Sequence, residues 1–181
     1  MNLALTRHPD TPCAAVESIT VDVARSGPGR LAFRYTLTGS IGDLLMPPVV
    51  GPTRAEELWK HTCLEAFLRP ARNEWYAEFN FSPSKQWAAY RFQRYREGME
   101  HLRQPPPRID VRSTECQYEM SVVDVATGIL PGQPRWLLGL SAVIEETNGR
   151  KSCWALAHPP GKPDFHHADG FVFELPAAET A

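Results

Sequence analysis

A proline-rich segment near the C-terminus holds the densest group of side chains that could bind a metal ion or transfer a proton. Three histidines and an aspartate, His158, Asp164, His166 and His167, fall within ten positions. Imidazole and carboxylate groups bind divalent metals, and imidazole titrates near neutral pH. The spacing matches no helical ligand pair, and the neighbouring prolines predict an irregular loop. We therefore take His158, Asp164 and His166 as candidate ligands of a divalent metal in a metal-dependent enzyme, which is one of three functional hypotheses.

Glu65 is the second residue whose position suggests chemistry. It alternates with Cys63 and Phe67, so period-two spacing places a carboxylate on an otherwise apolar strand face. A buried carboxylate is costly unless it is paired. Two arrangements satisfy this condition: an ion pair with an arginine such as Arg91, or a position facing a ligand cavity. The sequence leaves both open.

Several common functional signatures are missing from the sequence. It contains no glycine-rich dinucleotide or phosphate loop, no Gly-x-Ser-x-Gly and no His-Glu-x-x-His. Four cysteines, at positions 13, 63, 116 and 153, are separated by 50, 53 and 37 positions, which excludes the close pairs of structural zinc sites. We expect reduced thiols.

The elements that must position these residues are short strands. Residues 31–38 alternate between apolar and polar side chains, as do residues 19–23, and the intervening glycines and proline predict a hairpin. Residues 74–82 alternate with a polar second face that contains Tyr76, Glu78 and Asn80, which suits a solvated or pocket-lining face. Residues 54–61 predict at most one helical turn. Further strands are expected at 63–68, 86–95, 109–112, 118–126, 136–144, 152–157 and 171–175, with residues 148–149 as a hairpin turn.

These elements predict an all-β chain, a single-domain antiparallel β-sandwich of the jelly-roll or immunoglobulin-like kind, over residues 1–181. It has about ten strands and at most short helical turns. The length of 181 residues suits one domain, and 43% hydrophobic with 22% charged residues is typical of a globular protein. The 17 prolines also favour many short elements, because proline is excluded from helix interiors and central strands.

The net charge and the hydropathy of the sequence limit the classes of binding partner that we expect. The formal net charge of −2 gives no basic excess for nucleic acid or anionic lipid. No apolar run approaches the length of a membrane span, and the first residues lack the pattern of a secretory signal. We therefore expect a cytoplasmic protein whose partner is a small molecule or saccharide rather than nucleic acid or a membrane.

The most specific pattern in the chain is Leu-Trp-x-His-Thr-Cys-x-Glu-x-Phe from Leu58, followed by Glu-Phe-Asn-Phe-Ser-Pro-Ser from Glu78. With Gln-Trp-Ala-Ala-Tyr, Gly-Leu-Ser-Ala-Val-Ile-Glu and Pro-Asp-Phe-His, it resembles an uncharacterised bacterial subgroup of the DOMON-like superfamily, which is related to family 9 carbohydrate-binding modules. These blocks run from Leu58 to Phe173. The resemblance implies a β-sandwich that binds a ligand on a concave face or loop rim.

In the sugar-binding members, two tryptophans enclose the saccharide and polar side chains bind its hydroxyls. The resemblance therefore implies Trp59 as one aromatic platform, Glu65 as an acidic ligand-binding residue and Trp154 as a candidate second platform. Arg91 is added to this ligand-binding set from the residues themselves, as a cation that can pair with Glu65. His61 and Thr62 stand where those modules usually have acidic residues, and Ser-Pro-Ser-Lys replaces Asn-Pro-x-Gly. These departures leave sugar specificity and any structural calcium open.

The leading hypothesis is thus a non-catalytic ligand-binding β-sandwich for a carbohydrate or another polyhydroxylated molecule. A structural or protein-interaction module, in which Trp59, Trp87 and Trp154 serve only as packing residues, is the third hypothesis. Redox members of the DOMON superfamily bind haem through Met and His. Met99 and His101 are the corresponding pair to consider, although they are too close in sequence to approach a haem from opposite sides without a chain reversal.

Overall fold

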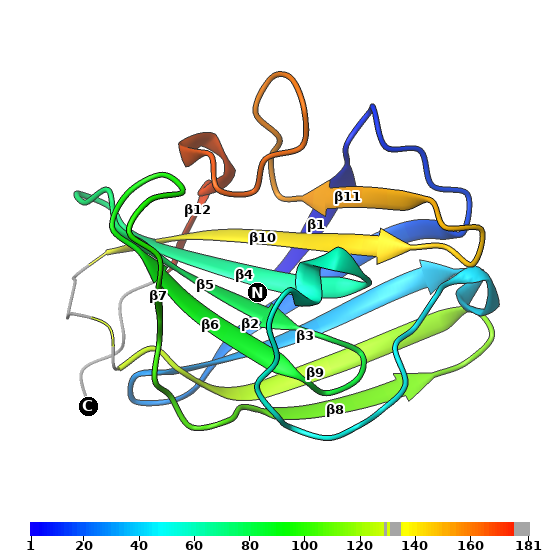
Figure 1. The fold of residues 1–181 in the computed structure, drawn as a ribbon, viewed down its shortest axis with the longest axis horizontal. Helices are drawn as coiled ribbons and strands as arrows, with labels where there is room; N and C mark the ends of the chain where they lie inside the picture. The colour runs from blue at the N-terminus through cyan, green and yellow to red at the C-terminus, as the bar shows by residue number, and fades with distance from the viewer. Residues whose placement is uncertain (129, 131–134, 176–181) are drawn as a thin grey trace.

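Twelve antiparallel strands form one hydrogen-bonded sheet that folds over on itself in the computed structural model, which describes residues 1–128, 130 and 135–175 (Figure 1). The strand order is β7-β6-β5-β4-β10-β11-β1-β2-β3-β9-β8, and β12 pairs with β10. The strands are β1 (Asn2–Arg7), β2 (Val16–Gly27), β3 (Arg30–Gly39), β4 (Cys63–Pro70), β5 (Tyr76–Phe81), β6 (Trp87–Phe92), β7 (Glu100–His101), β8 (Arg108–Ser113), β9 (Gln117–Ala126), β10 (Trp136–Glu145), β11 (Lys151–Ala155) and β12 (Phe173–Leu175).

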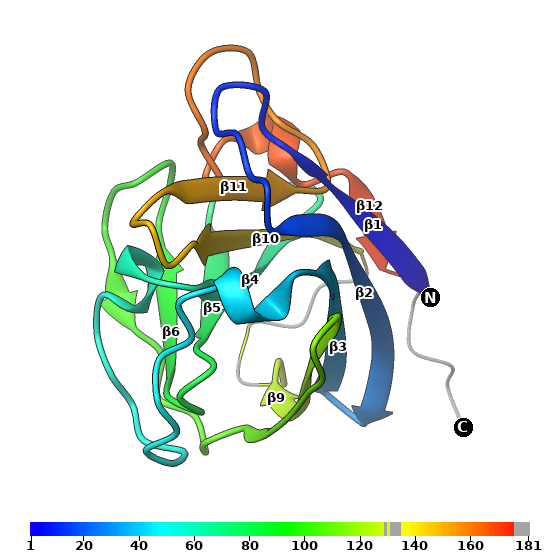
Figure 2. The same cartoon turned by 90° about the vertical axis from the view of Figure 1, so that its right-hand side faces the viewer.

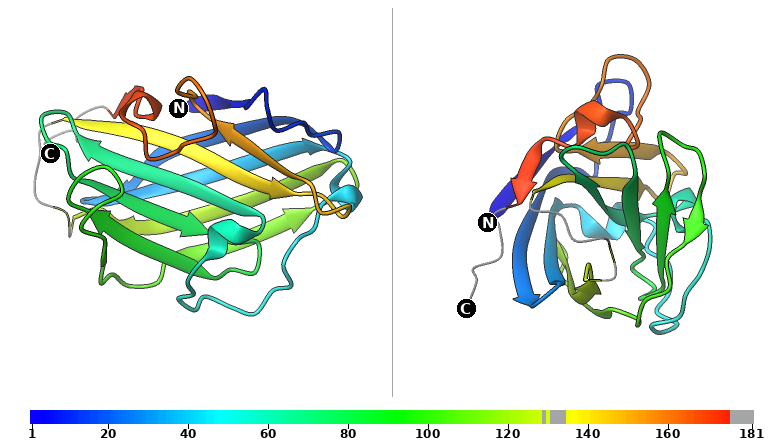
Figure 3. Two further views of the ribbon diagram at one scale, coloured as in Figure 1. Left: turned by 45° about the horizontal axis from the view of Figure 1, so that its top comes forward. Right: turned by 90° about the vertical axis from the view of Figure 1, so that its left-hand side faces the viewer.

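The fold gives two facing layers (Figures 2 and 3). One layer contains β2, β3, β9 and β8, and the other contains β4 to β7 with β10 to β12. β1 joins them, because its first part pairs with β2 while Thr6 and Arg7 pair with β11. This arrangement confirms the predicted all-β sandwich.

The core lies between the two layers. The alternating apolar residues of β2, β3 and β9 face those of β4, β5 and β10, and most are almost fully buried. The rings of Phe33 and Phe81 lie 6.2 Å apart across the interface. Tyr35 Oη donates a hydrogen bond to the backbone oxygen of Glu65 at 2.9 Å, which satisfies a buried hydroxyl and ties β3 to β4. The core therefore fixes the position of β4, the strand that carries Glu65.

Most expected elements are present. The β2–β3 and β10–β11 hairpins form as predicted, residues 86–95 contain a strand, and β10 is central between β4 and β11. The helical turn expected over residues 54–61 is a 3-10 turn, η2 (Leu58–Lys60). Two further turns of this kind are η1 (Ile41–Asp43) and η3 (Ala168–Gly170). No described helix has the length and apolar character needed to span a membrane.

Two strands escaped prediction. β1 alternates over only six residues, and β7 has two residues, so neither gives a strong sequence signal.

A second difference from the sequence-based expectation concerns the outer face of the second layer. Its apolar side chains form a second small cluster of Phe67, Tyr76 and Phe171, outside the main core. The alternating residues of β4 and β5 are therefore buried on both faces. The opposite layer covers one face, and residues 156–172, between β11 and β12, cover the other and are called the covering segment.

Candidate functional site

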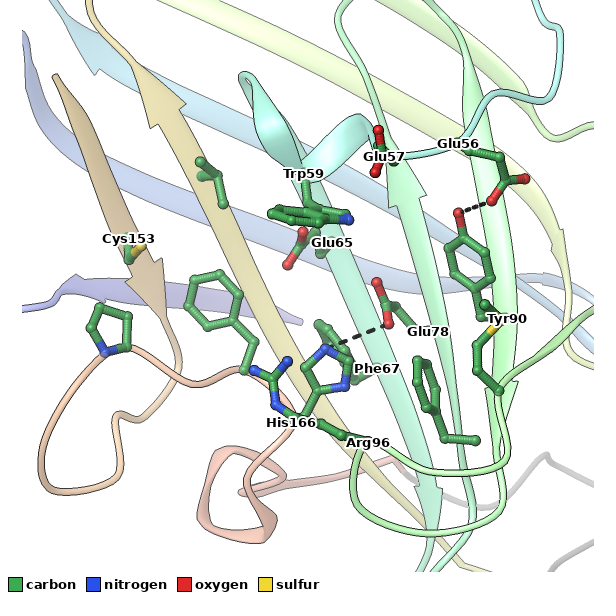
Figure 4. Close-up of a pocket in the computed structure, with 15 residues that line it drawn as sticks. Glu56, Glu57, Trp59, Glu65, Phe67, Glu78, Tyr90, Arg96, Cys153 and His166 are labelled. Atoms are coloured by element: carbon green, nitrogen blue, oxygen red, sulfur yellow. Dashed lines mark hydrogen bonds and ion pairs between the residues drawn. The ribbon is translucent and has the colours of Figure 1, made fainter. Parts of the chain in front are cut away.

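A cavity of about 440 Å³ opens on the outer face of the second layer (Figure 4). Its floor is formed by side chains of β4, β5 and β6, and its walls come from η2, the turn after β6 and the segment before η3. Five aromatic side chains line it together with four glutamates. Such a concave mixture of aromatic and polar groups is typical of small-molecule sites.

Strand register places two of these glutamates side by side on the floor. Glu65 lies opposite Asn80 on β5 and opposite Ser141 on β10, whereas Glu78 lies opposite Phe67. Because side chains alternate along a strand, these residues all point to the outer face, while their neighbours point into the core. Figure 4 shows the carboxyl groups of Glu65 and Glu78 directed into the cavity.

Both floor carboxyl groups are almost fully buried, with exposed fractions of 2% for Glu65 and 5% for Glu78. Ser141 Oγ donates to Glu65 Oε2 at 2.7 Å, and Asn80 Nδ2 donates to Glu78 Oε1 at 2.8 Å. Burial, together with the charge of Glu78, raises the pKa of Glu65 to about 8. Burial also raises the pKa of Glu78 to about 7. The two groups therefore titrate as a pair near neutral pH, a property often found at functional sites.

His166 forms the wall next to Glu78. Its Nδ1 lies 2.7 Å from Tyr76 Oη, and its Nε2 lies 3.8 Å from Glu78 Oε2. Burial and the nearby Arg96 charge lower the pKa of His166 to about 4, so the imidazole is neutral at pH 7. His166 thus contributes a hydrogen-bonding group to the wall and no positive charge.

The rim carries the remaining polar groups in paired form. Tyr90 Oη donates to Glu56 Oε2 at 2.6 Å, and Arg54 Nε lies 3.1 Å from Glu56 Oε1. Burial acts against ionisation of Glu56, but these two hydrogen bonds hold its pKa below the usual value. Arg96 forms an ion pair with Asp164 at 2.8 Å.

Trp59 and Glu65, the two residues of the Trp-x5-Glu block, come together at this cavity. Trp59 lies in η2 with 51% of its surface exposed, so it is an exposed aromatic at the mouth rather than a core residue. Of the two arrangements considered for Glu65, the structure has the one in which it faces a cavity.

Arg91 and Trp154 do not join them, which corrects both expectations. Arg91 pairs with Glu100 at 3.4 Å, and its guanidinium lies 4.9 Å from the centre of the Trp75 ring. Trp154 is 5% exposed, packs in the main core and donates from Nε1 to Ser152 Oγ. The alternation of β11 turns its tryptophan toward the opposite layer, and Cys153 faces the cavity instead.

Of the three candidate metal ligands, Asp164 and His166 are neighbours, since the His166 backbone N–H donates to Asp164 Oδ1 at 3.1 Å, whereas His158 has other contacts. His158 Nε2 contacts the backbone oxygen of Thr6 at 2.8 Å, whereas Asp164 pairs with Arg96 and His166 with Tyr76. Within the described ranges, no group of three or more His, Cys, Asp or Glu side chains is arranged to hold a metal ion. The structure therefore does not bring His158, Asp164 and His166 together as ligands of one ion.

Met99 and His101, the pair considered for haem, have different contacts. Met99 lines the cavity, while His101 Nδ1 lies 2.6 Å from Arg54 Nη2 and 3.6 Å from Glu56 Oε1. Nδ1 of His101 is thus in contact with Arg54 and with the rim residue Glu56. Haem ligation needs two side chains on opposite faces of the porphyrin or one free proximal ligand.

Several lining residues were not singled out from the sequence. Phe67, Tyr90 and Phe92 come from strands, and Arg96 and Phe165 come from loops. The signal for the strand residues was the alternation itself, which grouped Tyr76, Glu78 and Asn80 on one polar face. The loop residues had no such signal, because only tertiary packing brings residue 165 over β4.

The fold has a relative among solved structures. A candidate carbohydrate-binding protein from Bacteroides uniformis ATCC 8492 matches 95% of this chain and 84% of its own chain, with a TM-score of 0.69 and 15% sequence identity. No family model matches the sequence. No curated protein matches it either. The structural likeness shows a shared fold, and the DOMON-like resemblance stays a prediction.

Proposed function

We propose that this protein binds a carbohydrate or a similar polyhydroxylated small molecule in the cavity beneath Trp59. The observation that carries the proposal is the position of an exposed indole at the mouth of a cavity whose floor includes two buried carboxyl groups. The Bacteroides neighbour with the same fold, itself a candidate carbohydrate-binding protein, adds support.

The chemistry of the cavity suits such a ligand. A sugar ring has apolar C–H faces that pack on aromatic rings, and Trp59, Tyr90 and Phe92 offer such rings. Its hydroxyl groups lose hydrogen bonds to water on binding and need placed partners. Glu65, Glu78 and His166 can supply them, the carboxyl groups as acceptors or donors according to their protonation.

Titration calorimetry of the purified protein with neutral and amino mono- and disaccharides tests the proposal. We expect at least one saccharide to bind, and we expect Trp59→Ala to weaken that binding about tenfold or more, since buried aromatic contacts contribute one to a few kcal/mol. Leu45→Ala is the matched control, because Leu45 is also an exposed apolar side chain but does not line the cavity.

Unchanged affinity in Trp59→Ala would show that the saccharide binds elsewhere. Absence of binding by every saccharide, with no change in tryptophan fluorescence, would instead favour the structural or protein-interaction module.

A further inference from the structure

We infer that the ligand of this cavity carries a protonated amine, seated between Glu65 and Glu78, which identifies the ligand class as a cationic amino sugar. The inference rests on the proposed function and deepens it. Two buried carboxyl groups form the floor, and no lysine or arginine in the described part of the chain forms an ion pair with either. A cation from the ligand would supply the missing partner.

The other charged groups around the cavity already have partners. Glu56 is bound by Arg54 and Tyr90, and Glu57 pairs with Lys60 at 2.6 Å. Arg96, the one cationic side chain among the described lining residues, forms its ion pair with Asp164, and its charge only partly offsets the effect of burial on the pKa of Glu78. The electrostatic imbalance is therefore confined to the floor, where the two glutamates are.

The two carboxyl groups of the floor also have hydrogen-bond acceptor sites that no protein donor uses among the described residues. Each carboxylate offers two oxygens with about four acceptor sites in all. Glu65 Oε2 receives one hydrogen bond, from Ser141, and Glu78 Oε1 receives one, from Asn80. Figure 4 shows both carboxyl groups directed into the cavity, and His166 Nε2 lies 3.8 Å from Glu78 Oε2. An ammonium group has three donors and no acceptor, so it complements this surface better than a hydroxyl.

The strand geometry places the two carboxyl groups at a separation that one ammonium group can bridge. Glu65 and Glu78 are diagonal neighbours on antiparallel strands, since Glu65 faces Asn80 and Glu78 faces Phe67. Diagonal neighbours lie about 7 to 8 Å apart. Charge-assisted N–H···O bonds are about 2.8 Å long, so one nitrogen between the two side chains can reach both.

In the protein without ligand, protonation prevents Glu65 and Glu78 from both carrying a negative charge. The raised pKa values of Glu65 and Glu78 mean that the pair holds at least one proton near pH 7. An ammonium group favours the ionised carboxylates, so its binding must release that proton to solvent. A neutral sugar makes no such demand.

Other titratable groups facing the pair keep their charge between pH 5.5 and 7.5. Burial raises the pKa of Cys63 and Tyr90 well above neutral, that of Cys153 to about 11 and that of Tyr76 to about 12, and it lowers that of His166 to about 4. Arg96 stays cationic. The protein's own contribution to a pH dependence of binding over this interval therefore comes from Glu65 and Glu78, and the known titration of the free ligand amine is subtracted from the measured dependence.

Calorimetry with matched sugars tests the inference. Glucosamine is compared with glucose and N-acetylglucosamine, and the β-1,4-linked glucosamine disaccharide with its N-acetylated form. At pH 7.0 we expect the free amines to bind about tenfold or more tightly, given the strength of hydrogen bonds to charged groups. Their apparent binding enthalpy should change with the ionisation enthalpy of the buffer, and their affinity should fall about tenfold between pH 7.5 and 5.5 as the carboxylates become protonated.

Variants of the two glutamates test whether they cause the preference for the amine. Glu65→Gln and Glu78→Gln keep the side-chain shape and remove the charge, so each should abolish most of the preference for the amine and the buffer dependence. Glu17→Gln, which removes an exposed glutamate of β2, should change neither. A melting temperature measured for each variant identifies any loss that comes from unfolding.

The outcomes separate the inference from the proposed function. Equal affinity for glucose and glucosamine, with sensitivity to Trp59→Ala, would overturn the inference and leave the proposed function standing. Equal binding of a simple diamine and of glucosamine would support the cationic site and contradict a carbohydrate ligand. No binding of either sugar class would overturn both.

Discussion

Tyr76 Oη lies 2.7 Å from His166 Nδ1 and joins β5 to the segment that covers the outer face of the sheet. The same hydroxyl accepts a hydrogen bond from the backbone N–H of Arg96 at 3.2 Å. Its own proton is thus available for Nδ1, which favours the imidazole tautomer with the proton on Nε2, toward Glu78. One hydroxyl therefore connects β5 in the floor of the cavity with the two wall segments that carry Arg96 and His166.

Tyr76→Phe should destabilise the protein by about 1 to 2 kcal/mol, because it leaves the Arg96 N–H and the His166 nitrogen without their shared partner. The ring itself should stay in place, since it stacks on Phe92 with centroids 4.9 Å apart. Urea unfolding measures the change. Tyr118→Phe is the matched control, because the Tyr118 hydroxyl is buried and has no hydrogen-bond partner among the described residues. Its removal should be neutral or stabilising, and an equal loss in both variants would contradict this explanation.

Stability should fall as pH rises from 6.5 to 8. The pKa values of Glu65 and Glu78 are raised in the folded protein, to about 8 and about 7, above the value of about 4.3 expected in the unfolded chain. The native state therefore binds more protons than the unfolded state in this interval, and the free energy of unfolding decreases by about 2 kcal/mol. Below pH 6.5, His166 acts in the opposite direction, because its folded pKa of about 4 lies below its unfolded value and its contribution is lost on acidification.

Urea unfolding at constant ionic strength across pH 6.5 to 8 measures this slope. The double variant Glu65→Gln, Glu78→Gln should flatten it, whereas Glu17→Gln should leave it unchanged. A slope that persists in the double variant would assign it to other groups.

Gly39→Ala should be severely destabilising. Gly39 ends β3 with φ of 139°, and a Cβ there would lie 2.1 Å from the backbone oxygen of Ala15. Both the backbone conformation and the contact oppose a side chain, so the expected loss exceeds about 3 kcal/mol. Gly51→Ala is the control, since Gly51 also has positive φ, of 113°, but open space around it. We expect Gly51→Ala to lower stability by about 1 kcal/mol, measured by thermal unfolding. The difference between the two losses then gives the cost of the steric contact with Ala15.

Substitutions of Trp154 and of Trp59 should affect different properties, stability in the first case and ligand binding in the second. Trp154→Phe removes core volume and the hydrogen bond to Ser152, so it should cost about 1 to 3 kcal/mol of stability and leave saccharide affinity unchanged. Trp59→Ala should show the reverse, because the indole is half exposed. Comparison of melting temperature with calorimetric affinity for both variants checks this. Loss of affinity in a folded Trp154→Phe would place a second platform near β11 after all.

The sequence by itself determined most of the strands and several of their connections. Period-two alternation over residues 31–38 and 74–82, and the Asn-Gly turn at 148–149, are local signals that hold wherever the strands lie in the fold. The same alternation grouped Glu78 with Asn80 and Glu65 with Phe67. What it left open was which of the two faces meets the other layer and which meets a cavity.

Only the tertiary structure decided that question. Trp59 and Trp154 are the same residue type, yet one is exposed at the cavity and the other is buried in the core. Their difference arises from the covering segment and from the orientation of β11, which depend on contacts between residues distant in sequence. The pairing of Glu65 with Glu78 has the same origin, because the register of β4 against β5 places them on a diagonal. A buried carboxylate can be recognised from its neighbours in sequence, but its partner is chosen by strands that meet only in the folded chain.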